Sequence, residues 1–328
     1  MKKIILFTLC LLQGVFLFGA VKTATYESED YNLYLNYNDV ITPGDAVFVR
    51  MTVTTHKSLK LPKEDLEKFA TLQLIKNKKV IEKAPFYTLS KSNKQNTAEL
   101  LCGIPVSMWL KDDGDYSLKV IVSPYKDKYD EVILPSTFIS RDFVEEVVEL
   151  NESNTAIKTN KSATRAQQID KLNNILFTSM PADIYSLEPF IKPTNCERLT
   201  SLYGDRRIYK YSNGKSSSGN PHNGIDYGVP EGTEVHSCAA GKVVMAENRI
   251  STGWSIVIEH LPGLYSLYYH LSSMNVKEGD MVEAGDLIGL SGKTGLATGP
   301  HLHWEVRLNG SAVNPEFFLT DFAFNNKK

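Results

Sequence analysis

Residues 299–306 read GPHLHWEV, and the alternation within this stretch predicts how its backbone lies. Side chains along a β-strand point to opposite faces in turn, so His301, His303 and Glu305 share one face. The residues between them are apolar, which makes the other face fit to bury. Two imidazoles therefore lie side by side on the polar face of a predicted strand, where a metal or a substrate can meet them.

Glycine and histidine are concentrated around this strand. Of the chain's 328 residues, 16 of 21 glycines and six of seven histidines lie between Leu202 and Gly310. Closely spaced glycines among Val- and Tyr-rich runs are typical of short strands joined by tight turns. The C-terminal part is therefore predicted to be a compact, twisted β domain that holds nearly all of the imidazole.

A second histidine segment, NPHNGIDYGVP at residues 220–230, supplies oxygen as well as nitrogen. His222 and Asp226 are four apart, which is a same-face spacing in a strand, and the nearby glycines and proline argue against a helix. Together with one imidazole of the HLH segment they make a three-ligand set. Such a set suits zinc with a fourth position open to water, which is the arrangement of a catalytic site.

Three histidine segments, in this order and with these separations, resemble peptidase family M23, the LytM or lysostaphin-type zinc endopeptidases. The resemblance runs from about residue 199 to residue 319. The segments that carry it are HNGID (222–226), LYYHLS (267–272) and TGPHLHWEV (298–306), with SLYGDRR (201–207) and VNPEFFL (313–319) at its two ends.

The resemblance implies a role for five side chains. His222, Asp226 and His303 would bind one zinc ion, while His270 and His301 would remain unligated beside it. Zinc lowers the pKa of bound water and polarises a peptide carbonyl, so no protein nucleophile is needed. The two unligated histidines would serve as acid/base and as oxyanion stabiliser, without a decision on which does which.

Three neighbours are further candidates. Tyr268 shares a predicted strand face with His270 and is a candidate substrate contact, with packing as the alternative. Arg207 is a candidate partner for a peptide carboxylate, with a solvated surface as the alternative. Glu305 lies on the histidine face, where it can support a ligand or form a salt bridge at the rim.

The implied function is that of an exported zinc metalloendopeptidase that hydrolyses peptide cross-links of bacterial peptidoglycan. The alternative is a non-catalytic relative that binds cell wall or activates another hydrolase, but all five site positions are present here. Residues 229–244 and 276–292 also look like the half-motifs of a biotinyl or lipoyl carrier. The hairpin lysine that a carrier needs is not apparent, so the similarity reports a shared β architecture.

Localisation and partners follow from the rest of the sequence. Residues 1–20 combine MKK with a mostly apolar run that ends in Gly-Ala, which predicts a signal peptide and a place in the periplasm or cell envelope. An uncleaved anchor is the alternative. The net charge of −2 offers no general basic field for nucleic acid.

The predicted architecture is mainly β, in two domains joined by a linker. Residues 25–145 contain short alternating segments, which suggest an Ig-like β-sandwich that could restrain access to the zinc cleft or recognise the wall or a regulatory protein. Residues 146–190 are expected to be a linker with a short helix capped by Thr164. Residues 191–320 form the peptidase domain of LytM-type antiparallel strands, and 321–328 a tail.

Three cysteines follow the predicted leader, at positions 102, 196 and 238, without CxxC spacing. They fit neither a zinc finger nor a disulfide framework. Isolated thiols are the expectation, with one disulfide as the alternative.

Overall fold

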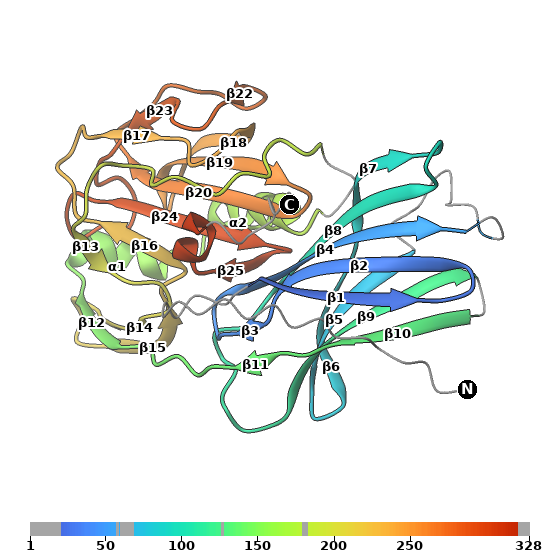
Figure 1. Cartoon of the computed structure of the whole chain (residues 1–328). Coiled ribbons are helices and arrows are strands. Elements are labelled where there is room, and N and C mark those ends of the chain that lie inside the picture. Colours follow the sequence, from blue (N-terminus) through green and yellow to red (C-terminus); the bar gives the residue numbers. More distant parts are fainter. Residues whose placement is uncertain (1–20, 57–58, 60–68, 126–127, 179–182, 321–328) are drawn as a thin grey trace. The chain divides into compact units, whose positions relative to one another are not determined.

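A computed structural model describes residues 21–56, 59, 69–125, 128–178 and 183–320. The predicted signal peptide and the C-terminal tail lie outside these described residues. The chain forms two compact units, of which the second comprises residues 141–320. Figure 1 shows strands throughout both units and helices near the middle of the chain.

The first unit is a sandwich of two antiparallel sheets, as expected. Both sheets contribute to one apolar core, for example through Leu35, Met51 and Leu72, which are fully buried. Burying a side chain of this size stabilises the fold by about 1.5–3 kcal/mol. One sheet has the order β1 (Val21–Glu27), β2 (Tyr31–Asn38), β4 (Ala46–Thr55), β8 (Thr97–Pro105), β7 (Tyr87–Ser92); the other has the order β10 (Lys128–Leu134), β9 (Tyr116–Tyr125), β5 (Ala70–Lys76), β6 (Lys79–Pro85); β11 (Thr137–Phe138) pairs with β3 (Val40–Ile41).

The second unit is built on one long sheet. Its strands lie in the order β13 (Leu199–Ser201), β16 (Gly224–Tyr227), β24 (Leu302–Leu308), β20 (Leu264–Leu271), β19 (Gly253–Leu261), β18 (Gly241–Arg249), β22 (Met281–Val282), with β25 (Ser311–Val313) beside β24. The HLH strand is therefore central and has strands on both sides.

Two small sheets and a 3-10 helix also belong to the second unit. One sheet has the order β12 (Glu145–Glu149), β14 (Arg206–Lys210), β15 (Ser216–Pro221); the other has the order β17 (Glu234–His236), β23 (Leu287–Leu290), β21 (Ser273–Met274). A 3-10 helix, η2 (Pro315–Leu319), follows β25.

The segment expected to be a linker differs most from the prediction. It contains β12 and two helices, α1 (Glu152–Thr159) and α2 (Ala163–Leu176), and all three belong to the second unit. Ser162, and not Thr164, caps α2 by accepting a hydrogen bond from the Arg165 amide. Leu176 is buried among residues of β18, β19 and β20, so α2 packs on the long sheet.

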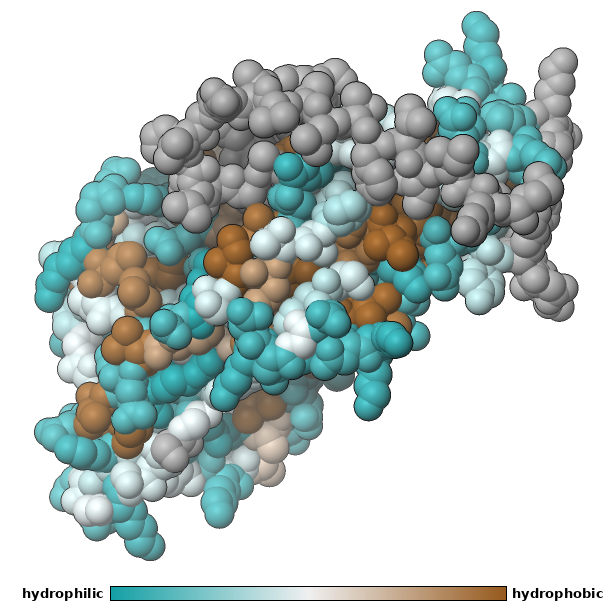
Figure 2. Space-filling model, turned by 60° about the horizontal axis from the view of Figure 1, so that its bottom comes forward, coloured by the Kyte–Doolittle hydropathy of each residue, from teal (hydrophilic) through white to brown (hydrophobic). Residues whose placement is uncertain are grey.

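The structure also describes the cysteines, the character of the helices and the distribution of hydrophobic residues on one face. The cysteines at 102, 196 and 238 are free thiols. Within the part of the chain that the structure describes, no helix has the length and apolar character needed to cross a membrane. On the face drawn in Figure 2, hydrophobic residues reach the surface in several groups bordered by hydrophilic ones.

Candidate metal centre

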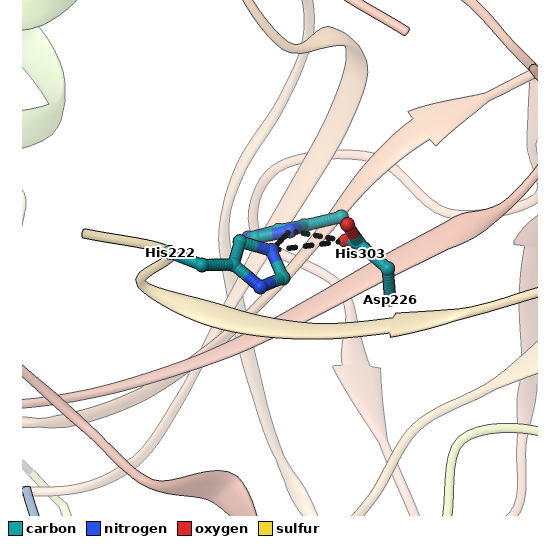
Figure 3. A group of neighbouring side chains, drawn as sticks. All are labelled: His222, Asp226 and His303. Carbon is teal, nitrogen blue, oxygen red and sulfur yellow. Dashed lines mark hydrogen bonds and ion pairs between the residues drawn. The ribbon is translucent and has the colours of Figure 1, made fainter. Parts of the chain in front are cut away.

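The pairing of two strands brings the two ligand segments together. β16 pairs with β24 in antiparallel register, so that Asp226 lies directly opposite His303. Gly224 permits this pairing, because a Cβ at that position would lie 2.3 Å from the Trp304 carbonyl oxygen. His222 precedes β16 by two residues and reaches the same point. Figure 3 shows the three side chains converging.

The distances within this group suit a small cation. His222 Nε2 lies 3.1 Å from Asp226 Oδ1 and 3.0 Å from His303 Nδ1, and His303 Nδ1 lies 2.8 Å from the same carboxylate oxygen. A tetrahedral zinc site with arms near 2.0–2.1 Å has ligand atoms about 3.3 Å apart. Two imidazole nitrogens and one carboxylate oxygen therefore fit three corners of a zinc site with little movement.

Hydrogen bonds outside the group orient both ligand imidazoles. His222 Nδ1 lies 2.8 Å from the Leu202 carbonyl oxygen, which can only accept, so the hydrogen is on Nδ1 and the lone pair on Nε2 faces the site. On His303, Nε2 lies 3.2 Å from Glu305 and leaves Nδ1 toward the site. Glu305 is itself paired with Arg307, so it supports a ligand.

The other two predicted histidines lie beside this group. The ring centroids of His270 and His301 are 4.7 Å apart, and His301 Nε2 is 3.8 Å from Asp226 Oδ1. Each ring directs Nδ1 to a carbonyl oxygen at 2.8 Å, that of Thr294 for His270 and that of Gly299 for His301. Both histidines therefore keep Nε2 available for a proton or a hydrogen bond.

Tyr268 does not share a strand face with His270. The prediction that Tyr268 contacts the substrate is therefore wrong. Its side chain is fully buried, and its hydroxyl accepts a hydrogen bond from the Cys238 amide at 2.9 Å. The alternation on which the prediction rested breaks at His270, whose φ of 63° is left-handed. Tyr269 lies on the metal face instead and stacks on His303, with ring centroids 5.3 Å apart.

Arg207 contacts the candidate metal ligand Asp226, which the sequence did not predict. It donates to Asp226 Oδ2 at 2.6 Å and to Glu146 Oε2 at 3.0 Å. Its side chain is only 16% exposed. Two carboxylates therefore contact its Nε and NH2 groups, and Arg207 also belongs to the lining of the cleft beside the site, so its contact with a substrate carboxylate stays a prediction.

Burial and charge set the protonation of the group. Burial, with help from His301 and His303, lowers the pKa of His270 to about 3, so this imidazole is neutral at pH 7. Burial opposes the charged form of His303, but hydrogen bonds with Asp226 and Glu305 raise the pKa of His303 to about 9. Metal binding at its Nδ1 must therefore displace a proton.

A cleft of about 220 Å³ opens beside these residues. Its lining includes Asp226, His270 and His301, together with Glu146 and Val148 of β12. The sequence did not predict that β12 lines the cleft. The alternation of EEVVE at 145–149 is typical of a strand, but nothing local to it indicates which strand it joins.

Comparison with known proteins identifies the unit that carries this site. The model of peptidase family M23 matches residues 220–315, which contain the three ligands and both further histidines. The catalytic domain of a mutant of the prophage-encoded M23 protein EnpA from Enterococcus faecalis is 33% identical, over 38% of this chain and 95% of that domain, with a TM-score of 0.33. The chain belongs to peptidase family M23.

Two further relatives of this M23 chain define how far the likeness extends. Peptidoglycan DD-endopeptidase ShyA of Vibrio cholerae is 41% identical over 117 residues, which are 36% of this chain and 26% of ShyA. A solved structure from Pseudomonas aeruginosa described as a putative M23 peptidase has a TM-score of 0.53 at 20% identity, and covers 85% of this chain and 94% of that one. It shows that the fold is shared. The M23 chain matches 35% or less of the length of three curated relatives.

Proposed function

We propose that this chain is an exported zinc endopeptidase that hydrolyses peptide cross-links of bacterial peptidoglycan. The convergence of His222, Asp226 and His303, with His270 and His301 beside Asp226 in the lining of a cleft, carries the proposal. M23 peptidases are zinc metallopeptidases, and the relative ShyA is named as a peptidoglycan DD-endopeptidase. Export rests on the predicted leader.

His222, Asp226 and His303 would hold one zinc ion and leave its fourth position open to water. Bound zinc supplies Lewis acidity, which polarises a peptide carbonyl and makes water more acidic. His270 is fixed at Nδ1 by the Thr294 carbonyl oxygen, so its Nε2 is the atom that can take part in the reaction.

His301 lies beside His270 and is likewise anchored at Nδ1, and both residues line the cleft. Either imidazole can therefore move the proton while the other donates a hydrogen bond to the developing oxyanion. We treat the two as a pair that shares these roles.

Digestion of defined muropeptides, followed by mass spectrometry, tests the proposal. We expect the zinc-loaded protein to cleave cross-linked dimers at one type of peptide bond, and a chelator to abolish cleavage. Intact dimers after incubation with protein of confirmed zinc content would contradict it. Binding to isolated cell walls without cleavage would instead support the alternative, a non-catalytic wall-binding or hydrolase-activating protein. Restraint by the N-terminal domain, or a regulatory protein partner, stays a prediction.

A further inference from the structure

The two oxygens of the Asp226 carboxylate have different partners. Oδ1 faces the two ligand imidazoles, at 3.1 Å from His222 and 2.8 Å from His303. Oδ2 accepts a hydrogen bond from Arg207 at 2.6 Å. Asp226 therefore presents one oxygen to the metal position, while a guanidinium occupies the other.

Arg207 is itself held at two of its nitrogens. Its Nε donates to Glu146 Oε2 at 3.0 Å, and its NH2 group donates to the Ser201 hydroxyl oxygen at 2.8 Å. The Ser201 hydroxyl donates in turn to Glu146 Oε2 at 2.9 Å. A planar fork held at several points has little freedom, so the direction of the bond to Asp226 is set in advance.

Strand pairing brings Glu146 to this position. β12 pairs with β14 in parallel register, with Glu146 opposite Arg207. Glu146 lies outside residues 220–315, where the family model matches. A segment upstream of the matched region thus takes part in the surroundings of the metal ligands.

The charge balance beside Asp226 requires both Arg207 and Glu146. A guanidinium next to Asp226 places positive charge near the position that a dication would occupy, and by itself this opposes metal binding. Glu146 carries the opposite charge and contacts the same guanidinium, with its own side chain 32% exposed. The pair is neutral as a unit, so it can orient Asp226 without repelling the metal.

We propose that Glu146 and Arg207 are positioning residues for the metal centre: Arg207 holds Asp226 as a ligand through one oxygen, and Glu146 fixes Arg207 and offsets its charge. This inference rests on the proposed zinc site. It predicts that each residue matters for zinc affinity and that the two act through one another.

Zinc affinity of the full chain, measured by competition with a chromophoric chelator, tests the pair. Outer partners of metal ligands typically contribute 10–100-fold to affinity. We expect Glu146→Gln and Arg207→Met each to weaken zinc binding by about 10-fold. In the double variant, the loss should be close to that of Arg207→Met alone, because Glu146 acts through Arg207.

Two neighbouring substitutions are matched controls. Arg206→Met removes the adjacent guanidinium on the same strand, which lies over the ring of Phe143 with Cζ 4.5 Å from the ring centroid. Glu149→Gln removes another β12 carboxylate, which pairs with the exposed Lys210. Both controls should keep wild-type zinc affinity.

The cobalt(II)-substituted protein gives a second readout that a purely structural salt bridge would not move. Arg207→Met frees Oδ2 to join the metal, so the coordination number rises and the d–d absorption of cobalt weakens relative to wild type. Arg207→Lys keeps the charge but loses the fork, so it should bind zinc with intermediate affinity. It also serves as the test variant if Arg207→Met does not fold.

The outcomes separate this inference from the proposed function. Wild-type protein that binds no zinc overturns both. Wild-type zinc binding with variant affinities within about 2-fold of it and an unchanged cobalt spectrum overturns the positioning roles alone. Fully additive losses in the double variant would also overturn them, because Glu146 would then act independently of Arg207.

Discussion

Buried histidine lies on both faces of the same long sheet, as a group on one face and as the single His260 on the other, and only the group has the form of a site. His303 pairs with Tyr269 on the metal face, while Tyr268 and Trp304 pair on the other face. Behind Tyr268 lies His260, which is fully buried. Burial of histidine is therefore common to both faces and does not distinguish them.

The difference lies in what happens to the second ring nitrogen. His260 lies 2.8 Å from the Ala240 carbonyl oxygen through Nδ1 and 2.7 Å from the Ser266 hydroxyl through Nε2. Ser266 continues to Tyr268, and Tyr268 to the Cys238 amide, so donors and acceptors form a satisfied chain. On the metal face each imidazole contacts an anchor through one nitrogen, and the other nitrogens of His222 and His303 converge on Asp226 Oδ1. A candidate site is therefore distinguished by imidazole nitrogens that converge on one point, and not by the burial of histidine.

Removing one of the three proposed zinc ligands should have the largest effect on the metal face. Asp226→Ala or His303→Ala should lower zinc affinity by more than the 10–100-fold typical of an outer partner, because a coordinate bond is lost. We expect about one zinc per wild-type chain after mild dialysis, measured by elemental analysis. Wild-type occupancy in either variant would remove that residue from the ligand set.

The second test separates the unligated pair from the ligands. His270→Ala and His301→Ala should keep zinc and fold but lose turnover by on the order of 10²-fold or more, because proton transfer and oxyanion stabilisation are lost. Muropeptide cleavage rates measured alongside zinc content check this. A variant that cleaves at the wild-type rate would take its histidine out of the mechanism.

The third test uses pH on the opposite face. Burial lowers the pKa of His260 to about 4 from the ordinary 6.5, so the unfolded chain takes up this proton first as pH falls. The free energy of unfolding should therefore decline between about pH 6.5 and pH 4, by on the order of 3 kcal/mol from this group.

Denaturant unfolding at several pH values, with a chelator present so that zinc linkage does not contribute, measures this decline. His260→Gln should show a shallower decline than wild type over the same range. Parallel curves for the two proteins would mean that His260 does not titrate differently in the folded state.

The smallest expected effect comes from Ser266→Ala. It removes the hydroxyl between His260 and Tyr268, and unpaired buried groups should lower the free energy of unfolding by about 1–3 kcal/mol. Zinc affinity should not change, because the hydrogen bonds of Ser266 lie on the other face of the sheet. A large loss of zinc affinity at equal fold would show that the two faces are coupled.

Much of the site could be predicted because its signals are local. The period of two in the HLH segment placed His303 and Glu305 on one face, and their contact confirms it. The four-residue spacing of His222 and Asp226 likewise allowed both to converge. Tyr268 shows where the rule fails, because a single left-handed residue, His270, reverses the alternation and leaves no mark in the residue types.

The strand period, the donor chemistry and the family could be predicted from the sequence, since these depend on residue types at short spacings. Which strands pair is visible only in the three-dimensional fold. The register of β16 against β24 sets Asp226 opposite His303, and that of β12 against β14 sets Glu146 opposite Arg207. Both pairings join segments separated by about 60 residues or more, and they depend on how whole strands bury their apolar faces together, which no local pattern encodes.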